Sequence, residues 1–128
     1  MQEFVAYKGS QFTIEWYYDA NGKSDVFEYY ESLDFPQKRK IIMLFKKMSD
    51  FGRIRDITKF RNEGNKIYAF KPKPDRFLSF FYTGSKIIVT NAFVKKSDKL
   101  PDEEKERALK RRQDYIRREQ EGTYYDDI

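Results

Sequence analysis

The chain lacks two residue types that carry much of protein chemistry: its 128 residues include no cysteine and no histidine. Without cysteine there is no disulfide framework and no thiolate nucleophile, which suits a reducing compartment. Without histidine there are no ordinary zinc sites, serine–histidine triads or histidine-based acid–base pairs. Any catalysis must therefore use Lys, Arg, Tyr, Asp or Glu, and we expect no metal and no other cofactor.

Long apolar runs are missing as well. No segment approaches the roughly 20 apolar residues that a membrane-spanning helix needs, and the N-terminal residues show no signal-peptide pattern. We therefore expect a cytoplasmic protein that does not contact a membrane.

Aromatic and charged residues are plentiful. The 12 Phe and 10 Tyr supply large apolar side chains, which favours a folded chain over a disordered one. We expect a single domain over residues 1–122, followed by a loose acidic tail over residues 123–128. The formal net charge of +5 favours polyanionic partners such as nucleic acid or an acidic protein surface.

The strongest structural pattern lies between Arg76 and Val94. Two aromatic and β-branched runs, residues 76–82 and 86–94, are linked by Thr83-Gly84-Ser85, which predicts a β-hairpin in the middle of a sheet. Further strands are predicted over residues 3–8, 12–18, 58–61 and 67–71, and helices after Ser24, after Asp34 and over about 102–121. This order predicts an α+β fold, an antiparallel meander sheet with the helices packed on one face.

Cations gather near the ends of the predicted meander strands. They are Lys59 and Arg61 on the first strand, Lys71 and Lys73 after the second, Arg76 at the start of the third, and Lys95, Lys96 and Lys99 after the fourth. Such a cluster could bind phosphates or stabilise charge on a phosphoryl group. Lysines beside turns are also commonly solvent-facing, and this simpler interpretation stays open. If the chain stays extended through Lys95 and Lys96, only one of the two can face a substrate.

The region from Ile67 to Ile116 resembles the C-terminal half of the HigB-like, phage-derived branch of the RelE toxin superfamily. It has an aromatic strand, an Arg-aromatic strand, a Gly turn, an aliphatic strand, the sequence Phe93-Val94-Lys95-Lys96 and a helix opened by Pro101. Arg76 matches the strand arginine of that family, and Lys71 stands where the family usually has arginine. The strand and two helices before this region are similar in order, so the resemblance covers nearly the whole chain.

The resemblance implies the toxin of a type II toxin–antitoxin system. Such toxins cleave mRNA, usually on the ribosome, and are silenced by a cognate antitoxin, which we expect to be of helix-turn-helix type. The family reaction is metal-independent: the ribose 2′-hydroxyl attacks the adjacent phosphate and leaves a cyclic phosphate. The alternative is a non-catalytic basic protein of phage or mobile-element origin that binds RNA, the ribosome or a protein partner.

Specific residues acquire expected roles from this resemblance. The expected catalytic residues are Lys71, Arg76, Lys95 and Lys96, and the expected RNA-binding residues are Lys59, Arg61, Lys73 and Lys99. Tyr68 and Phe70 could stack a base, although alternating strand aromatics are more often part of a core.

Overall fold

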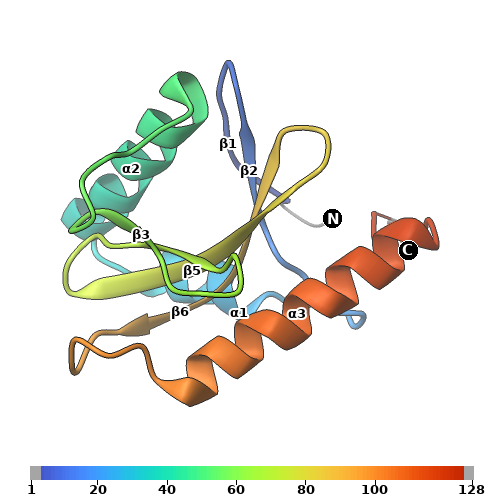
Figure 1. Ribbon diagram of the computed structural model, residues 1–128. Coiled ribbons are helices and arrows are strands. Elements are labelled where there is room, and N and C mark those ends of the chain that lie inside the picture. Colours follow the sequence, from blue (N-terminus) through green and yellow to red (C-terminus); the bar gives the residue numbers. More distant parts are fainter. Residues whose placement is uncertain (1–3, 126–128) are drawn as a thin grey trace.

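The computed structural model describes residues 4–125, and within them a six-stranded sheet carries three helices (Figure 1). The strand order in the sheet is β1-β2-β6-β5-β4-β3. The strands are β1 (Val5–Lys8), β2 (Thr13–Trp16), β3 (Phe60–Asn62), β4 (Tyr68–Phe70), β5 (Asp75–Tyr82) and β6 (Lys86–Val94), and the helices are α1 (Asp25–Ser32), α2 (Phe35–Phe51) and α3 (Asp102–Gln120). The α+β class is confirmed, and so is the central position of the β5–β6 hairpin.

One strand pairing departs from the predicted antiparallel meander. β2 runs parallel to β6, with Ile14 opposite Ile87 and Trp16 opposite Val89, whereas the other neighbouring strands are antiparallel. Parallel neighbours need a long connection, and the chain between β2 and β6 supplies one that includes α1, α2 and three strands.

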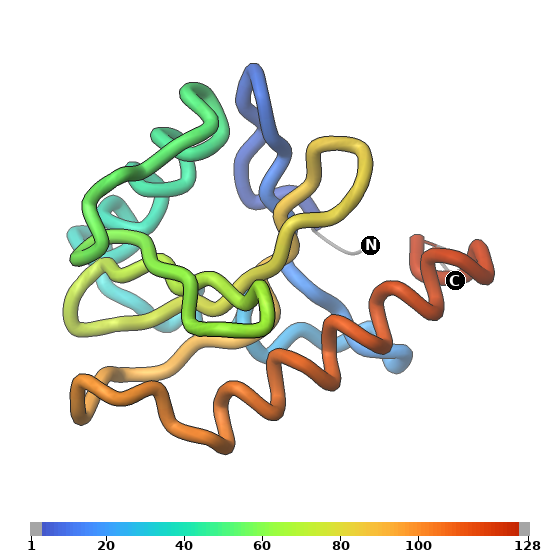
Figure 2. The backbone as a smooth tube through the Cα atoms, viewed as in Figure 1, coloured from blue at the N-terminus to red at the C-terminus, as the bar shows by residue number. Residues whose placement is uncertain are grey.

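The helices cover both faces of the sheet, which corrects the prediction of helices on one face. α1 and α2 pack on the face of the sheet that buries Trp16 and Phe77, where Phe45 of α2 is buried. α3 packs on the face that buries Leu78, where its own Tyr115 is buried. Figure 2 shows α2 and α3 on opposite sides of the strands. The reason is that β5 and β6 are apolar at successive positions. Because successive side chains point to opposite faces, both faces need a cover.

The first two helices begin directly after Ser24 and Asp34, as predicted. The side chain of Ser24 accepts a hydrogen bond from the amide of Phe27, and that of Asp34 accepts one from the amide of Gln37. Gly52 ends α2 with φ of 75°, a left-handed conformation that glycine adopts without steric cost. None of the helices within residues 4–125 has the length and apolar character to cross a membrane.

The chain after α3 is anchored as far as Tyr125, which corrects the prediction of a loose tail for residues 123–125. The Tyr124 side chain is 3% exposed, and its ring centroid lies 4.4 Å from that of Tyr115. The hydroxyl of Tyr125 donates to the buried carboxylate of Glu15 at 2.7 Å. The aromatic side chains explain the anchoring, since they gain from burial against the sheet. Residues 126–128 of the predicted tail lie outside the described part of the chain.

We expect Tyr125→Phe to lower the free energy of unfolding by about 1.5 kcal/mol, because a buried carboxylate then loses a hydrogen-bond donor. Equilibrium urea unfolding, followed by circular dichroism, measures the change. Tyr82→Phe is the matched control, since its hydroxyl donates at 2.6 Å to the more exposed Glu119. Equal losses in the two variants would contradict the anchoring role of Glu15.

Candidate functional site

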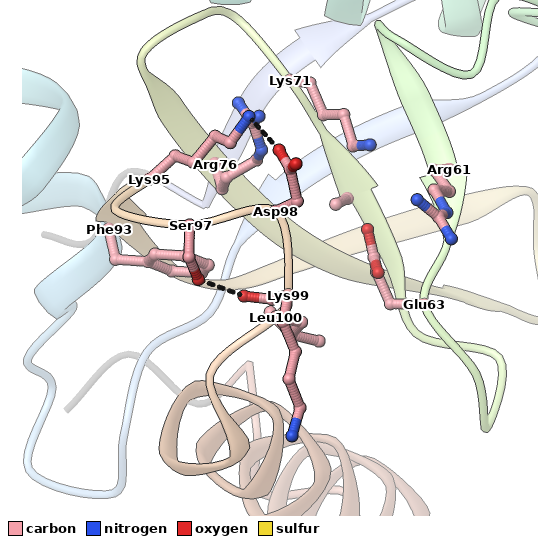
Figure 3. A pocket seen from close by; sticks show the side chains of 11 residues that line it. Arg61, Glu63, Lys71, Arg76, Phe93, Lys95, Ser97, Asp98, Lys99 and Leu100 are labelled. Carbon is pink, nitrogen blue, oxygen red and sulfur yellow. Dashed lines mark hydrogen bonds and ion pairs between the residues drawn. The ribbon is translucent and has the colours of Figure 1, made fainter.

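A pocket of about 270 Å³ opens on the α3 face of the sheet (Figure 3). It is lined by Arg61, Glu63, Ala69, Lys71, Arg76, Phe93, Lys95, Ser97, Asp98, Lys99 and Leu100. Ala69, Phe93 and Leu100 belong to the same apolar cluster as the buried side of α3. Five cations and two carboxylates surround this apolar floor, so the pocket carries a net positive charge.

The strand register explains why residues distant in sequence meet here. Arg76 of β5 lies opposite Phe93 of β6, and the amide of Lys95 donates to the carbonyl of Pro74 at 2.8 Å. Lys95 therefore lies at the end of the sheet that holds Arg76. On the neighbouring strands Arg61 is paired with Ala69, and Lys71 follows Ala69 by two residues. Because alternate residues share a face, these cations point to the α3 side.

Arg76 is the most enclosed cation of the pocket. Its side chain is 8% exposed, and its Nη1 donates to the carbonyl of Asp75 at 3.0 Å. Burial lowers the pKa of Arg76, against the opposing effect of Glu63, Asp75 and Asp98. The guanidinium is thus held in a partly dehydrated place, where its charge acts strongly on a bound anion.

A buried network on the opposite face holds the turn that precedes Arg76. Asp75 is 2% exposed and accepts hydrogen bonds from the hydroxyl of Tyr29 and, at 2.8 Å, from Nε2 of Gln37. The same Gln37 amide also donates to the carbonyl of Pro72. α1 and α2 therefore fix the backbone from which Arg76 projects.

Lys71 and Lys95 complete the cationic side of the pocket. Nζ of Lys71 donates to the carbonyl of Ile57 at 3.2 Å. Burial is the main cause that lowers the pKa of Lys71, and the charges of Arg76 and Lys95 act in the same direction. Nζ of Lys95 lies 2.8 Å from a carboxylate oxygen of Asp98, whose side chain is 97% exposed. Ion pairs at such exposure are weak, so a phosphate can displace Asp98 from Lys95.

The structure separates the eight sequence-predicted site residues into two groups. Those that line the pocket are Arg61, Lys71, Arg76, Lys95 and Lys99; those that do not are Lys59, Lys73 and Lys96. Although Lys99 lines the pocket, its amine points away from Arg76 and toward α3 in Figure 3. Lys96 is exposed next to Lys95 but does not line the pocket, so only one of these two neighbouring cations does.

The cations on either side of the turn between β4 and β5, which are Lys71, Lys73 and Arg76, do not all line the same cavity. Lys73 lines a different groove beside α2, together with Lys59. The aromatic residues Tyr68 and Phe70 are packed in the cluster on the α1–α2 side of the sheet, so they do not line the pocket.

Sequence reasoning missed the acids of the pocket. Glu63 follows β3 and lies two residues after Arg61, and Asp98 lies in the loop before α3, next to Lys99. Acidic residues close in sequence to the cations at the strand ends were the feature that could have predicted carboxylates in the pocket. Together these side chains can bind a phosphate, stabilise added negative charge on it and accept a proton. Within residues 4–125, no group of three or more His, Cys, Asp or Glu side chains is placed to hold a metal ion.

Comparison with known proteins yields one family match. A family model described as phage derived protein Gp49-like (DUF891) matches residues 28–113, about two thirds of the chain. The matched region begins in α1, ends in α3 and contains every residue that lines the pocket. No curated protein matches the chain.

Proposed function

The chain belongs to the Gp49-like family of phage-derived proteins, a RelE-like toxin family, and on this basis we propose that it is an endoribonuclease toxin that cleaves mRNA at the cationic pocket. The family membership implies an antitoxin partner. We propose further that this antitoxin is a helix-turn-helix protein encoded beside the toxin gene, and that cleavage takes place on ribosomes in the cytoplasm.

Three cations from separate chain segments converge on one pocket, and this supports the proposal most strongly. Lys71 follows β4, Arg76 belongs to β5 and Lys95 follows β6. A single solvent-facing lysine beside a turn is common, but this convergence matches the need of a phosphoryl-transfer site for several fixed positive charges. Glu63 adds a carboxylate in the same pocket.

The proposed reaction is an internal transesterification of RNA. The 2′-hydroxyl attacks the adjacent phosphorus, the bond from phosphorus to the 5′-oxygen breaks, and the products are a 2′,3′-cyclic phosphate and a 5′-hydroxyl. Arg76 and Lys95 stabilise the extra charge on the phosphorane. Glu63 accepts the proton of the 2′-hydroxyl. Lys71 gives a proton to the leaving 5′-oxygen, because its lowered pKa makes its ammonium a stronger acid than that of an ordinary lysine.

Induced expression should stop growth, and the purified chain should cut RNA either in a ribosome-free assay with divalent metal chelated or on isolated ribosomes whose magnesium is retained. Cleavage is measured in each format by mapping RNA 5′ ends, and the ribosome-free format tests metal independence. Metal independence is expected because Lys, Arg and a carboxylate supply the charge and the proton transfers. Absence of cleavage in both formats would leave the alternative, a basic protein that binds RNA, the ribosome or a partner without cutting.

A further inference from the structure

A second cavity, of about 530 Å³, lies between α2 and the turn after β4. We refer to it as the α2 groove, and its lining residues are Pro36, Arg39, Lys40, Met43, Leu44, Lys59, Lys71, Pro72 and Lys73. Two kinds of side chain make up the groove: an apolar floor of Pro, Met and Leu, and a rim of Lys and Arg. The Met43 side chain is 56% exposed although it is apolar.

The rim cations lack carboxylate partners. The lining of the groove includes five cations and no acid, and none of these cations forms a salt bridge within residues 4–125. Four of the five arginines of α3 differ, since Arg107, Arg111, Arg117 and Arg118 each pair with a carboxylate of the chain. Unlike those four arginines, the cations of the α2 groove have no carboxylate of the chain as an ion-pair partner within residues 4–125, so an external anion can pair with them.

The apolar side chains of the groove favour an acidic peptide over RNA as its occupant. No aromatic ring lines the groove, so it offers no stacking platform for a base. Met43, Leu44 and the two prolines instead form an apolar surface that suits an aliphatic side chain, and methionine adapts readily to a bound partner. Acidic residues on either side of such an anchor would meet the rim cations.

Lys71 connects the groove to the proposed active site, since it lines both cavities. A carboxylate bound in the groove can draw the Lys71 ammonium out of the pocket and leave the leaving 5′-oxygen without its proton donor. Occupation of the groove would therefore inhibit cleavage without filling the pocket itself.

We propose that the α2 groove binds an acidic segment with an aliphatic anchor, supplied by the antitoxin, and that this segment inhibits the toxin through Lys71. The proposal rests on the proposed function for the identity of the partner. The outer side of α3 is the competing surface, where Leu109, Arg112 and Ile116 line an apolar cavity. That cavity has fewer cations, and Arg117 in its lining is already paired with Asp114.

The test uses the full chain and, as probe, the protein encoded by the reading frame next to its gene, with affinity measured by titration calorimetry. We expect Lys40→Glu and Met43→Ala each to weaken binding about tenfold or more, as central contacts of an interface do. Lys47→Glu and Phe51→Ala are matched controls on exposed positions of α2 outside the groove, and they should change affinity less than about twofold. RNA cleavage by the free groove variants should stay at the wild-type rate.

Several results would overturn the proposal. The partner binds elsewhere if Arg112→Glu and Ile116→Ala weaken the complex while the groove variants do not. The groove is an RNA path if the free groove variants bind RNA as poorly as they bind the partner. If the adjacent protein does not bind but RNA is still cut, the groove assignment and the proposed neighbouring antitoxin are both wrong, and the proposed cleavage activity stands. If binding depends on the groove but RNA is never cut, the groove still binds the partner, but the proposed cleavage activity and its inhibition through Lys71 are both wrong.

Discussion

Arg76→Lys should lower single-turnover cleavage roughly a hundredfold or more at saturating RNA, with little loss of RNA affinity. Arg76 presents a planar fork that can donate two parallel hydrogen bonds to phosphate oxygens, and a lysine offers only a point charge. Its side chain is 8% exposed, so water cannot readily replace the missing donor. The effect should therefore appear in the cutting step, where charge on the phosphate increases.

The measurement combines single-turnover kinetics with RNA binding over a range of salt concentrations. Arg55→Lys is the matched control, because Arg55 is exposed and does not line the pocket. Thermal unfolding of both variants checks that the buried substitution leaves the fold intact. If Arg76→Lys changes only binding, the pocket docks RNA without cutting it, and the catalytic role assigned to Arg76 is wrong.

Lys95→Ala and Lys96→Ala should have unequal effects. Lys95 lines the pocket beside Arg76, so its removal should slow single-turnover cleavage by roughly a hundredfold while RNA still binds. Lys96 is exposed outside the pocket and can touch only a flanking phosphate. Its removal should weaken binding and reduce the salt dependence by about one charge, with the cutting rate nearly unchanged.

Asp98→Asn tests whether the ion pair with Asp98 is needed to hold Lys95 in the pocket. The pair of Lys95 and Asp98 lies at the open rim, so the substitution frees the ammonium without disturbing a buried contact. Cleavage should change no more than a few-fold.

The prediction for the two lysines is contradicted if Lys95→Ala and Lys96→Ala slow cleavage equally. In that case the alternation of the two side chains does not govern their roles, and the arrangement of the pocket is not the one in which RNA is cut.

The local elements could be predicted closely because their causes lie within a few residues of sequence. β5 and β6 match the predicted strands of the hairpin to within one residue, since aromatic and β-branched runs around a glycine turn specify them. The starts of α1 and α2 follow Ser24 and Asp34, whose side chains cap the amides three residues later. The loose-tail prediction was wrong for residues 123–125 because the burial of Tyr124 depends on Tyr115 and the sheet.

By itself the sequence determined the chemistry available to this protein: no histidine, no cysteine, many cations and an alternating strand end at Lys95 and Lys96. Only the tertiary structure decided which cations meet. The register of β3 to β6 brings Arg61, Lys71, Arg76 and Lys95 to one pocket, while Lys73 lines the α2 groove. The parallel β2–β6 pair and the position of α3 also depend on contacts between distant segments. The strand register, and the face of the sheet on which each helix packs, depend on which apolar faces bury each other. The free-energy difference between such arrangements has contributions from the whole chain, so no short stretch of sequence determines it.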